Sequence, residues 1–202
     1  MIKSMSRFIE TIRLKDGVIN NLRYHIERMH QSAEEVLRSK LKFDLDNALS
    51  FLSLPTKGLH KIRIVYDTEI RSVEITPYKR KEIRQLKIVY DNAISYDYKF
   101  ENRTELESLF SQRDECEDVI IIKDYAVTDT SYANLIFLRN GQWFTPKTFL
   151  LNGTTRRRLL EEKIIVERKI TINDLHRYEK VKLINAMLQF DGPEIDVSRI
   201  VD

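Results

Sequence analysis

The chain has 202 residues, and its 34 Lys and Arg against 31 Asp and Glu leave a formal net charge of +3. That balance is too even to indicate a nucleic-acid or membrane-surface protein. The single cysteine, Cys116, excludes an intramolecular disulfide framework, and the lack of an apolar run approaching the ~20 residues of a membrane span favours a cytoplasmic globular protein.

The first half of the sequence predicts strands around one long helix. The helix is expected where Leu22, Ile26, Met29, Ala33 and Leu37 recur at helical spacing and form one apolar stripe. The other expected elements are a hairpin of strands at 8–14 and 18–19, a short helix at 44–54, and paired strands at 62–66 and 73–75.

A polar and charged stretch that begins at Pro77 is the best candidate for a domain boundary. It divides the chain into a small α+β lobe at 1–78, a linker at 79–85 and a larger, β-rich lobe at 86–202. The second lobe is expected to contain strands at 86–90, 119–122, 127–138, 142–145, 164–170 and 181–190, and helices at 102–112, from 153 and after a capping box at 171–174. The sequence therefore predicts an α+β chain of two lobes.

Two ionisable residues of the second lobe could carry chemistry. Lys99 stands between a strand region that ends near Ser95 and a helix that begins near Asn102. A lysine that points from a strand end into a lobe interface loses hydration, and the lowered pKa exposes the amine lone pair that Schiff-base chemistry requires. Asp129 opens a long apolar strand and could keep a pyridine nitrogen protonated. The alternative for both is an ordinary solvated side chain.

The segment Asn-Gly-Thr-Thr-Arg at 152–156 is a turn that runs into a helix. Backbone N–H groups and the helix dipole favour a phosphate at such a point, and Gly153 would let the backbone approach it closely. A plain helix N-cap is the alternative, and the arginines at 156–158 are expected to form a solvated face. The four histidines lack a metal-ligand spacing, so no metal site is expected.

These features occur in an order that resembles the class IV aminotransferase and aminodeoxychorismate lyase family, whose members are pyridoxal-phosphate enzymes of fold type IV. Residues 98–103 are similar to the Lys-x-x-Asn-Arg motif of the lyases, and residues 127–135 to their Thr-Glu-x-x-x-Ala-Asn-Leu strand. The other similar segments are Phe-Thr-Pro at 144–146, Leu-Asn-Gly-Thr-Thr-Arg at 151–156, Ile-Asn-Ala-Met at 184–187, Phe-Ile-Glu-Thr-Ile-Arg at 8–13, and the helical segment 25–33 with its His-x-x-Arg spacing.

The resemblance implies a two-lobed, D-amino acid aminotransferase-like fold with a shortened N-terminal lobe, and pyridoxal 5'-phosphate as the cofactor. Lys99 would bear the cofactor and move protons, and Asp129 would pair with the pyridine nitrogen. The implied cofactor-binding residues are Arg28, Asp129, Thr154, Thr155 and Asn185. Helical periodicity alone would instead make Arg28 a surface arginine, because it lies off the apolar stripe.

The activity that the resemblance implies is a lyase reaction of folate biosynthesis, in which 4-amino-4-deoxychorismate gives 4-aminobenzoate and pyruvate. It also implies a homodimer that acts on a small-molecule substrate. The first rival is an aminotransferase of the branched-chain or D-amino acid type. A relative that has lost the cofactor is a second rival, because Asp129 replaces the usual Glu and sets its carboxylate ~1.5 Å further back. A third rival is a nucleic-acid-binding module built on the basic cluster of Lys79, Arg80, Lys81, Arg84 and Lys87, for which a solvated linker is the alternative.

Overall fold

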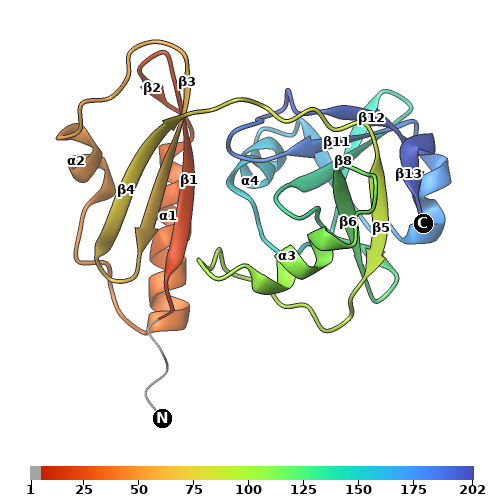
Figure 1. Cartoon of the computed structure of the whole chain (residues 1–202), viewed down its shortest axis with the longest axis horizontal. Coiled ribbons are helices and arrows are strands. Elements are labelled where there is room, and N and C mark those ends of the chain that lie inside the picture. Colours follow the sequence, from red (N-terminus) through yellow and green to blue (C-terminus); the bar gives the residue numbers. More distant parts are fainter. Residues whose placement is uncertain (1–5) are drawn as a thin grey trace. The chain divides into compact units, whose positions relative to one another are not determined.

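A computed structural model describes residues 6–202, which form two compact units (Figure 1). The first unit comprises Met1–Lys79 together with Tyr98–Asn102, and the second comprises Arg80–Asp97 together with Arg103–Asp202. The division after Lys79 lies next to the expected boundary. Residues 80–85 are part of the second unit rather than a separate linker, and Lys99 belongs to the first unit rather than to the second.

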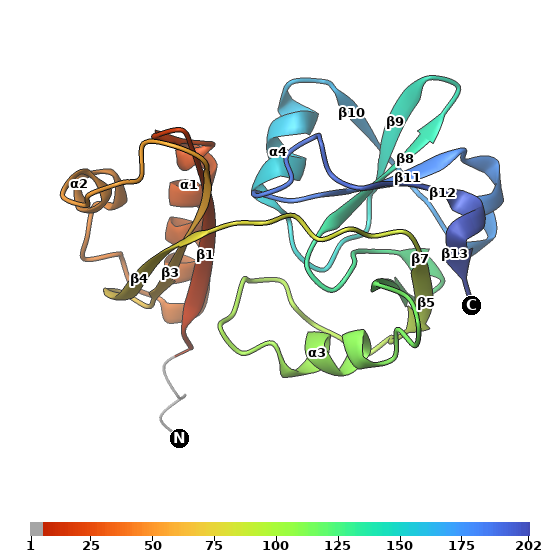
Figure 2. The same cartoon turned by 45° about the horizontal axis from the view of Figure 1, so that its top comes forward.

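The first unit is an antiparallel sheet with one helix along its face, as both Figure 1 and Figure 2 show. Its strands are β1 (Phe8–Lys15), β2 (Val18–Ile19), β3 (Leu59–Tyr66) and β4 (Ile70–Pro77), in the order β2-β1-β3-β4. The predicted long helix is present as α1 (Leu22–Ser32), which continues into the π-helical segment η1 (Ala33–Leu37). The second helix, α2 (Leu45–Ser50), is shorter than expected, and its N-cap is Asp44, whose side chain accepts from the N–H groups of Asp46 and Asn47.

The core of the first unit lies between β1 and α1. Successive side chains of a strand alternate between its two faces, so Phe8, Glu10, Ile12 and Leu14 share one face of β1. All four side chains are fully buried, and Met29 of α1 packs in the same cluster as the three apolar ones. A carboxylate therefore stands in an apolar row, where it requires charged or hydrogen-bonding partners.

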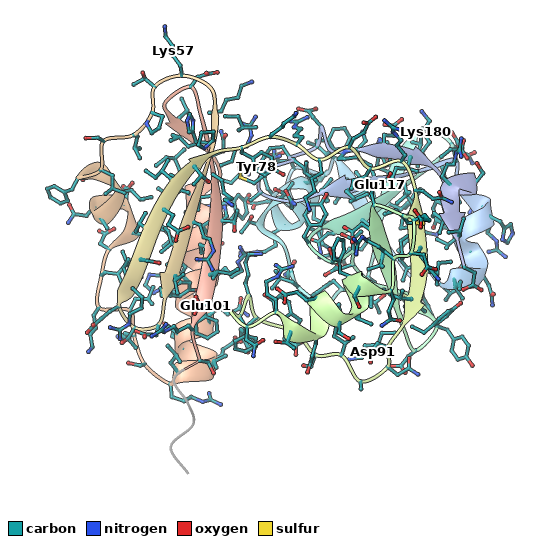
Figure 3. The ribbon with its side chains drawn as sticks, in the orientation of Figure 1. Lys57, Tyr78, Asp91, Glu101, Glu117 and Lys180 are labelled. Carbon is teal, nitrogen blue, oxygen red and sulfur yellow. The ribbon has the colours of Figure 1, made fainter. Side chains whose placement is uncertain are left out.

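The second unit contains two further sheets. One has the strand order β10-β9-β8-β11-β12 and the other the order β13-β5-β6-β7. The strands are β5 (Leu86–Tyr90), β6 (Asp118–Lys123), β7 (Ala126–Val127), β8 (Asn134–Arg139), β9 (Gln142–Pro146), β10 (Ile165–Arg168), β11 (Lys180–Ile184), β12 (Glu194–Asp196) and β13 (Ile200–Val201). The helices are α3 (Thr104–Ser111), α4 (Thr154–Glu161) and the short 3₁₀ segments η2 (Ile172–Arg177) and η3 (Val197–Arg199). Figure 3 marks Lys180 on β11, where its Nζ donates to Glu194 of the neighbouring β12.

Two of the expected strands end early because polar side chains fold the backbone into turns. The strand expected at 127–138 is interrupted between β7 and β8, where Thr130 Oγ1 accepts from the N–H groups of Tyr132 and Ala133. The strand expected at 181–190 stops after β11, where Asn185 Oδ1 accepts from the N–H groups of Met187 and Leu188. Both turns lie within segments that resemble family motifs. By contrast, the predicted capping box is present, with Thr171 and Asp174 bonding each other's backbone N–H groups.

Within residues 6–202, no helix is long and apolar enough to cross a membrane. The core of the second unit is a cluster of buried aliphatic and aromatic residues from both of its sheets, including Ile120 of β6 and Leu135 of β8. The first sheet of this unit therefore packs on the second, and the turn at 128–133 connects β7 of one sheet to β8 of the other.

Candidate functional site

Lys99 is anchored to β1 by the backbone of its own segment. The N–H of Ile9 donates to the carbonyl of Lys99 at 2.9 Å, and Phe100 forms an isolated bridge with Phe8, on which its ring stacks at 5.3 Å. The next residue, Glu101, is marked in Figure 3 beside β1, and its N–H donates to the carbonyl of Arg7. The Lys99 side chain is half-buried. No strand directly precedes Lys99, contrary to expectation. Its segment is instead held on the first unit by these contacts with β1.

The same unit buries a cluster of three ionisable side chains, Glu10 of β1 and His25 and Arg28 of α1. The Arg28 guanidinium donates through Nε to Glu10 Oε1 at 2.8 Å and through Nη2 to Glu10 Oε2 at 2.6 Å. His25 Nδ1 lies 2.6 Å from Glu10 Oε2. Arg28 is only 7% exposed, so the periodicity argument that made it a surface residue is wrong. The cause is Glu10, which gives the arginine a buried partner on the opposite element.

The charges in this cluster follow from its burial and pairing. Burial alone would raise the pKa of Glu10, but Arg28 and His25 outweigh it and hold the pKa at about 2. Burial lowers the pKa of His25 below its ordinary value, despite Glu10, and the charges of Arg28 and Lys99 lower it further. An ionised carboxylate can only accept, so the neutral His25 donates from Nδ1. Its Nε2 is a buried lone pair for which the described part of the chain provides no donor.

Asp129 is the buried carboxylate of the second unit. It lies in the turn between β7 and β8, is 6% exposed, and accepts from three N–H groups. Its Oδ2 accepts from the backbone N–H groups of Leu150 at 3.1 Å and Leu151 at 2.9 Å, and its Oδ1 accepts from Asn134 Nδ2 at 2.8 Å. Burial raises the pKa of Asp129 to about 6 even though these donors and Arg156 oppose it. The carboxylate is therefore fixed in place, and a nearby cation would relieve the cost of its ionisation.

The predicted phosphate turn leads directly from this carboxylate into α4. Gly153 precedes the first helical residue, and no side chain caps the N–H groups of the first turn. Thr154 and Thr155 are both buried, and within residues 6–202 no group bonds the Thr155 Oγ1 atom. Uncapped N–H groups and a buried hydroxyl at a helix N-terminus are the donors that a phosphate accepts from. Gly153 is the N-cap of α4, so the segment keeps the geometry of a helix start while its first-turn N–H groups remain available to a ligand.

The arginine that follows the turn is not solvated, contrary to expectation. Arg156 is 2% exposed, and its Nη2 donates to the carbonyl of Pro146 at 3.0 Å and to Glu167 at 2.6 Å. Asn185, the last implied cofactor ligand, is half-buried. Its Oδ1 caps the turn at 186–189, and its Nδ2 donates to the carbonyl of Tyr132 at 3.3 Å. The Asn185 side chain therefore bonds both its own turn and the distant segment that contains Tyr132.

The described residues also bear on the remaining sequence expectations. Among them, no group of three His, Cys, Asp or Glu could hold a metal ion. Most of the basic cluster at 79–87 is paired: Arg84 bonds Glu82, Lys87 bonds Asp114, and Arg80 donates to the carbonyl of Asp191. Carboxylates therefore neutralise two of the five basic residues of this cluster, Arg84 and Lys87.

Two residues that matter to this geometry carried no assigned role in the sequence. Glu10 and Asn134 each occur in a segment that resembles a family motif, the strand at 8–13 and the strand at 127–135. Each one orients a predicted site residue, Glu10 by binding Arg28 and Asn134 by binding Asp129. Their presence in the motifs was the available signal. Their partners are not readable from the sequence, because Arg28 lies 18 positions from Glu10 and Asp129 lies in a turn that brings it back to Asn134.

Comparison with known proteins identifies the family. The family model of class IV aminotransferases matches residues 7–190. The chain belongs to the class IV aminotransferase family. A crystal structure of a Haemophilus somnus 129pt protein, provisionally named 4-amino-4-deoxychorismate lyase, is 38% identical with a TM-score of 0.85, and the match covers 93% of this chain and 98% of that one.

Two other proteins are similar to this chain. A Schizosaccharomyces pombe protein, provisionally named aminodeoxychorismate lyase, is 30% identical over 203 residues, which cover 90% of this chain and 86% of the relative. A Mycobacterium tuberculosis structure described as a hypothetical aminotransferase in its pyridoxal-phosphate-bound form has a TM-score of 0.78 at 16% identity, and it covers 98% of this chain and 82% of that one. The chain thus has the fold of type IV pyridoxal-phosphate enzymes, with a small first unit, as the resemblance implied.

Proposed function

We propose that this class IV aminotransferase family member binds pyridoxal 5'-phosphate and acts as a lyase on 4-amino-4-deoxychorismate, releasing 4-aminobenzoate and pyruvate. This assignment puts the enzyme in folate biosynthesis. The observation that carries the cofactor assignment is the connection in the second unit between the buried Asp129 carboxylate and the uncapped start of α4. Lyase activity is supported by the provisional names of the Haemophilus somnus and Schizosaccharomyces pombe relatives.

The residues of the second unit fit the two polar ends of this cofactor. The first-turn N–H groups of α4 and the hydroxyls of Thr154 and Thr155 would bind the phosphate, and the unpartnered Thr155 Oγ1 fits that role best. Asp129 would hold the proton on the pyridine nitrogen, because a buried carboxylate is stabilised by an adjacent cation. Each carboxylate oxygen accepts two donors, and Asn134 occupies only one position on Asp129 Oδ1. The shorter Asp side chain is thus compatible with the role.

Arg28 and Lys99 of the first unit complete the assignment. Arg28 would also bind the phosphate, with its guanidinium plane held by Glu10, and Asn185 would support this end through its backbone. Lys99 would hold the cofactor through Nζ, and the same nitrogen would move protons at the substrate. The bound cofactor supplies an electron sink to the reaction.

An amino acid aminotransferase is the second candidate, favoured by the family to which the chain belongs. The same cofactor residues serve both reactions. The Lys-x-x-Asn-Arg and Asn-Ala segments at 99–103 and 185–186 support the lyase. Purified protein should therefore be loaded with pyridoxal 5'-phosphate and supplied with 4-amino-4-deoxychorismate. Appearance of 4-aminobenzoate and pyruvate in equal amounts supports the lyase, whereas amine transfer to an α-keto acid without those products supports the aminotransferase.

We also propose that the enzyme is a homodimer, as the resemblance to fold-type-IV enzymes implies. A stable dimer of this size should bury at least ~1,200 Å² of total surface. Light scattering at micromolar concentration should give twice the 24.1 kDa mass of the chain. A mass of one chain would contradict this assembly without affecting the cofactor assignment.

A further inference from the structure

Asn134 links two parts of the second unit that are far apart in the sequence. It is the first residue of β8, is 6% exposed, and forms an isolated bridge with Asp129. Its Nδ2 donates to Asp129 Oδ1 and to the carbonyl of Leu151, both at 2.8 Å. One amide group therefore uses both of its N–H donors, one on the carboxylate and one on the segment that leads into α4.

The other end of the same amide contacts Gly153. A Cβ atom built on Gly153 would lie 2.1 Å from Asn134 Oδ1, which is far too close for any real contact. The backbone of Gly153 has φ −65° and ψ 145°, a conformation that every residue type adopts readily. Glycine is therefore required at this position by the Asn134 side chain. This differs from the sequence expectation, in which Gly153 served the close approach of a ligand.

We propose that Asn134 is a positioning residue that holds the Asp129 carboxylate and the turn at 151–153 in one fixed relation. This inference rests on the proposed function, because the carboxylate and the turn are the groups assigned to the two ends of the cofactor. A ligand that engages both ends gains from a fixed distance between them, since the second contact then forms without a further loss of freedom. A ligand that engages only one end gains nothing from it. Asn134 itself need not touch the cofactor.

The structural part of this inference is tested without any cofactor. Gly153→Ala in the parent protein should lower the melting temperature by about 5 °C or more, because the new methyl group collides with a buried side chain. The same substitution in an Asn134→Ala background should cost less than half as much, because the collision partner is gone. Asn152→Ala is the matched control, since the Asn152 side chain accepts from Arg156 instead. In the Asn152→Ala background, Gly153→Ala should lower the melting temperature by as much as it does in the parent.

The cofactor part is tested by comparing three ligands. We expect Asn134→Ala to weaken pyridoxal 5'-phosphate binding about tenfold or more, while the affinities for pyridoxal alone and for inorganic phosphate alone change less than about threefold. If Asn134→Ala does not fold, Asn134→Ser provides the same comparison with a smaller cavity. Equal losses for all three ligands, or equal costs of Gly153→Ala in every background, would overturn the inference. A parent protein that binds no pyridoxal 5'-phosphate would instead overturn the proposed function, and the melting-temperature comparison would still decide whether Asn134 clamps the turn.

Discussion

Asp129→Asn removes a buried charge while keeping the shape of the side chain, and its effect on stability should depend strongly on pH. Burial raises the pKa of Asp129 from the ordinary 3.8 to about 6 in the folded protein. The unfolded chain then loses this proton before the folded chain does as the pH rises. The stability that protonated Asp129 contributes to the folded protein is therefore fully present below about pH 4 and is lost as the pH rises through about 6. The loss amounts to about 3 kcal/mol.

The asparagine variant has no proton to lose at this position. As the pH is raised from 4 to 7.5, its free energy of unfolding should therefore increase by about 3 kcal/mol relative to that of the parent. Urea unfolding of both proteins across this range measures the difference and cancels the titration of His25 and Glu10, which both share. Asp46→Asn, which removes an exposed carboxylate of the first unit, controls for the loss of one negative charge. Saturating pyridoxal 5'-phosphate should reduce the parent's loss, because a pyridinium beside Asp129 favours the ionised form. A parent-to-variant difference in unfolding free energy that stays constant with pH would show that the Asp129 carboxyl has the same pKa in the folded and unfolded chain.

Two further substitutions test the other polar groups. Glu10→Gln should destabilise the protein by about 3–5 kcal/mol at pH 7, because it leaves the buried Arg28 without its counter-charge. In the parent, the stability that ionised Glu10 contributes should be present above pH 4.5 and lost toward pH 2. If urea unfolding gives a destabilisation below about 1 kcal/mol for Glu10→Gln, the pair is solvated. Thr155→Val should leave the cofactor-free protein equally stable or more stable, because it removes a buried hydroxyl without a partner. The same variant should bind pyridoxal 5'-phosphate more weakly and pyridoxal equally well, and an unchanged preference for the phosphorylated form would remove Thr155 from the phosphate site.

The local patterns of the sequence predicted most elements of the fold. The apolar stripe from Leu22 to Leu37 predicted the first helix, and strands were predicted at the positions of β5, β6 and β9. Parallel pairings such as β5 with β6 were not predicted, because they join strands separated by a helix and have no local turn signal. The strand expected at 127–138 is broken at Thr130. Its hydroxyl accepts from the N–H groups of Tyr132 and Ala133, and these hydrogen bonds compete with strand pairing.

The candidate site was less readable, because its residues depend on partners that only the fold brings together. Arg28 is buried on account of Glu10, 18 positions away, and an apolar periodicity does not register a charged pair of this kind. Asp129 is held by backbone N–H groups of residues 150 and 151, which no side-chain motif records. The need for glycine at 153 comes from Asn134. Family resemblance selected these segments, while the physical reason for each residue became visible only in the structure.

Borohydride reduction of the loaded protein tests whether Lys99 carries pyridoxal 5'-phosphate. Reduction makes the lysine linkage permanent, so peptide mass spectrometry can locate the modified residue. We expect a cofactor-derived mass increase on the peptide that contains Lys99, and none in Lys99→Ala, which should still unfold cooperatively like the parent. Modification of a different lysine, or a loaded parent protein with no modified peptide at all, would contradict it.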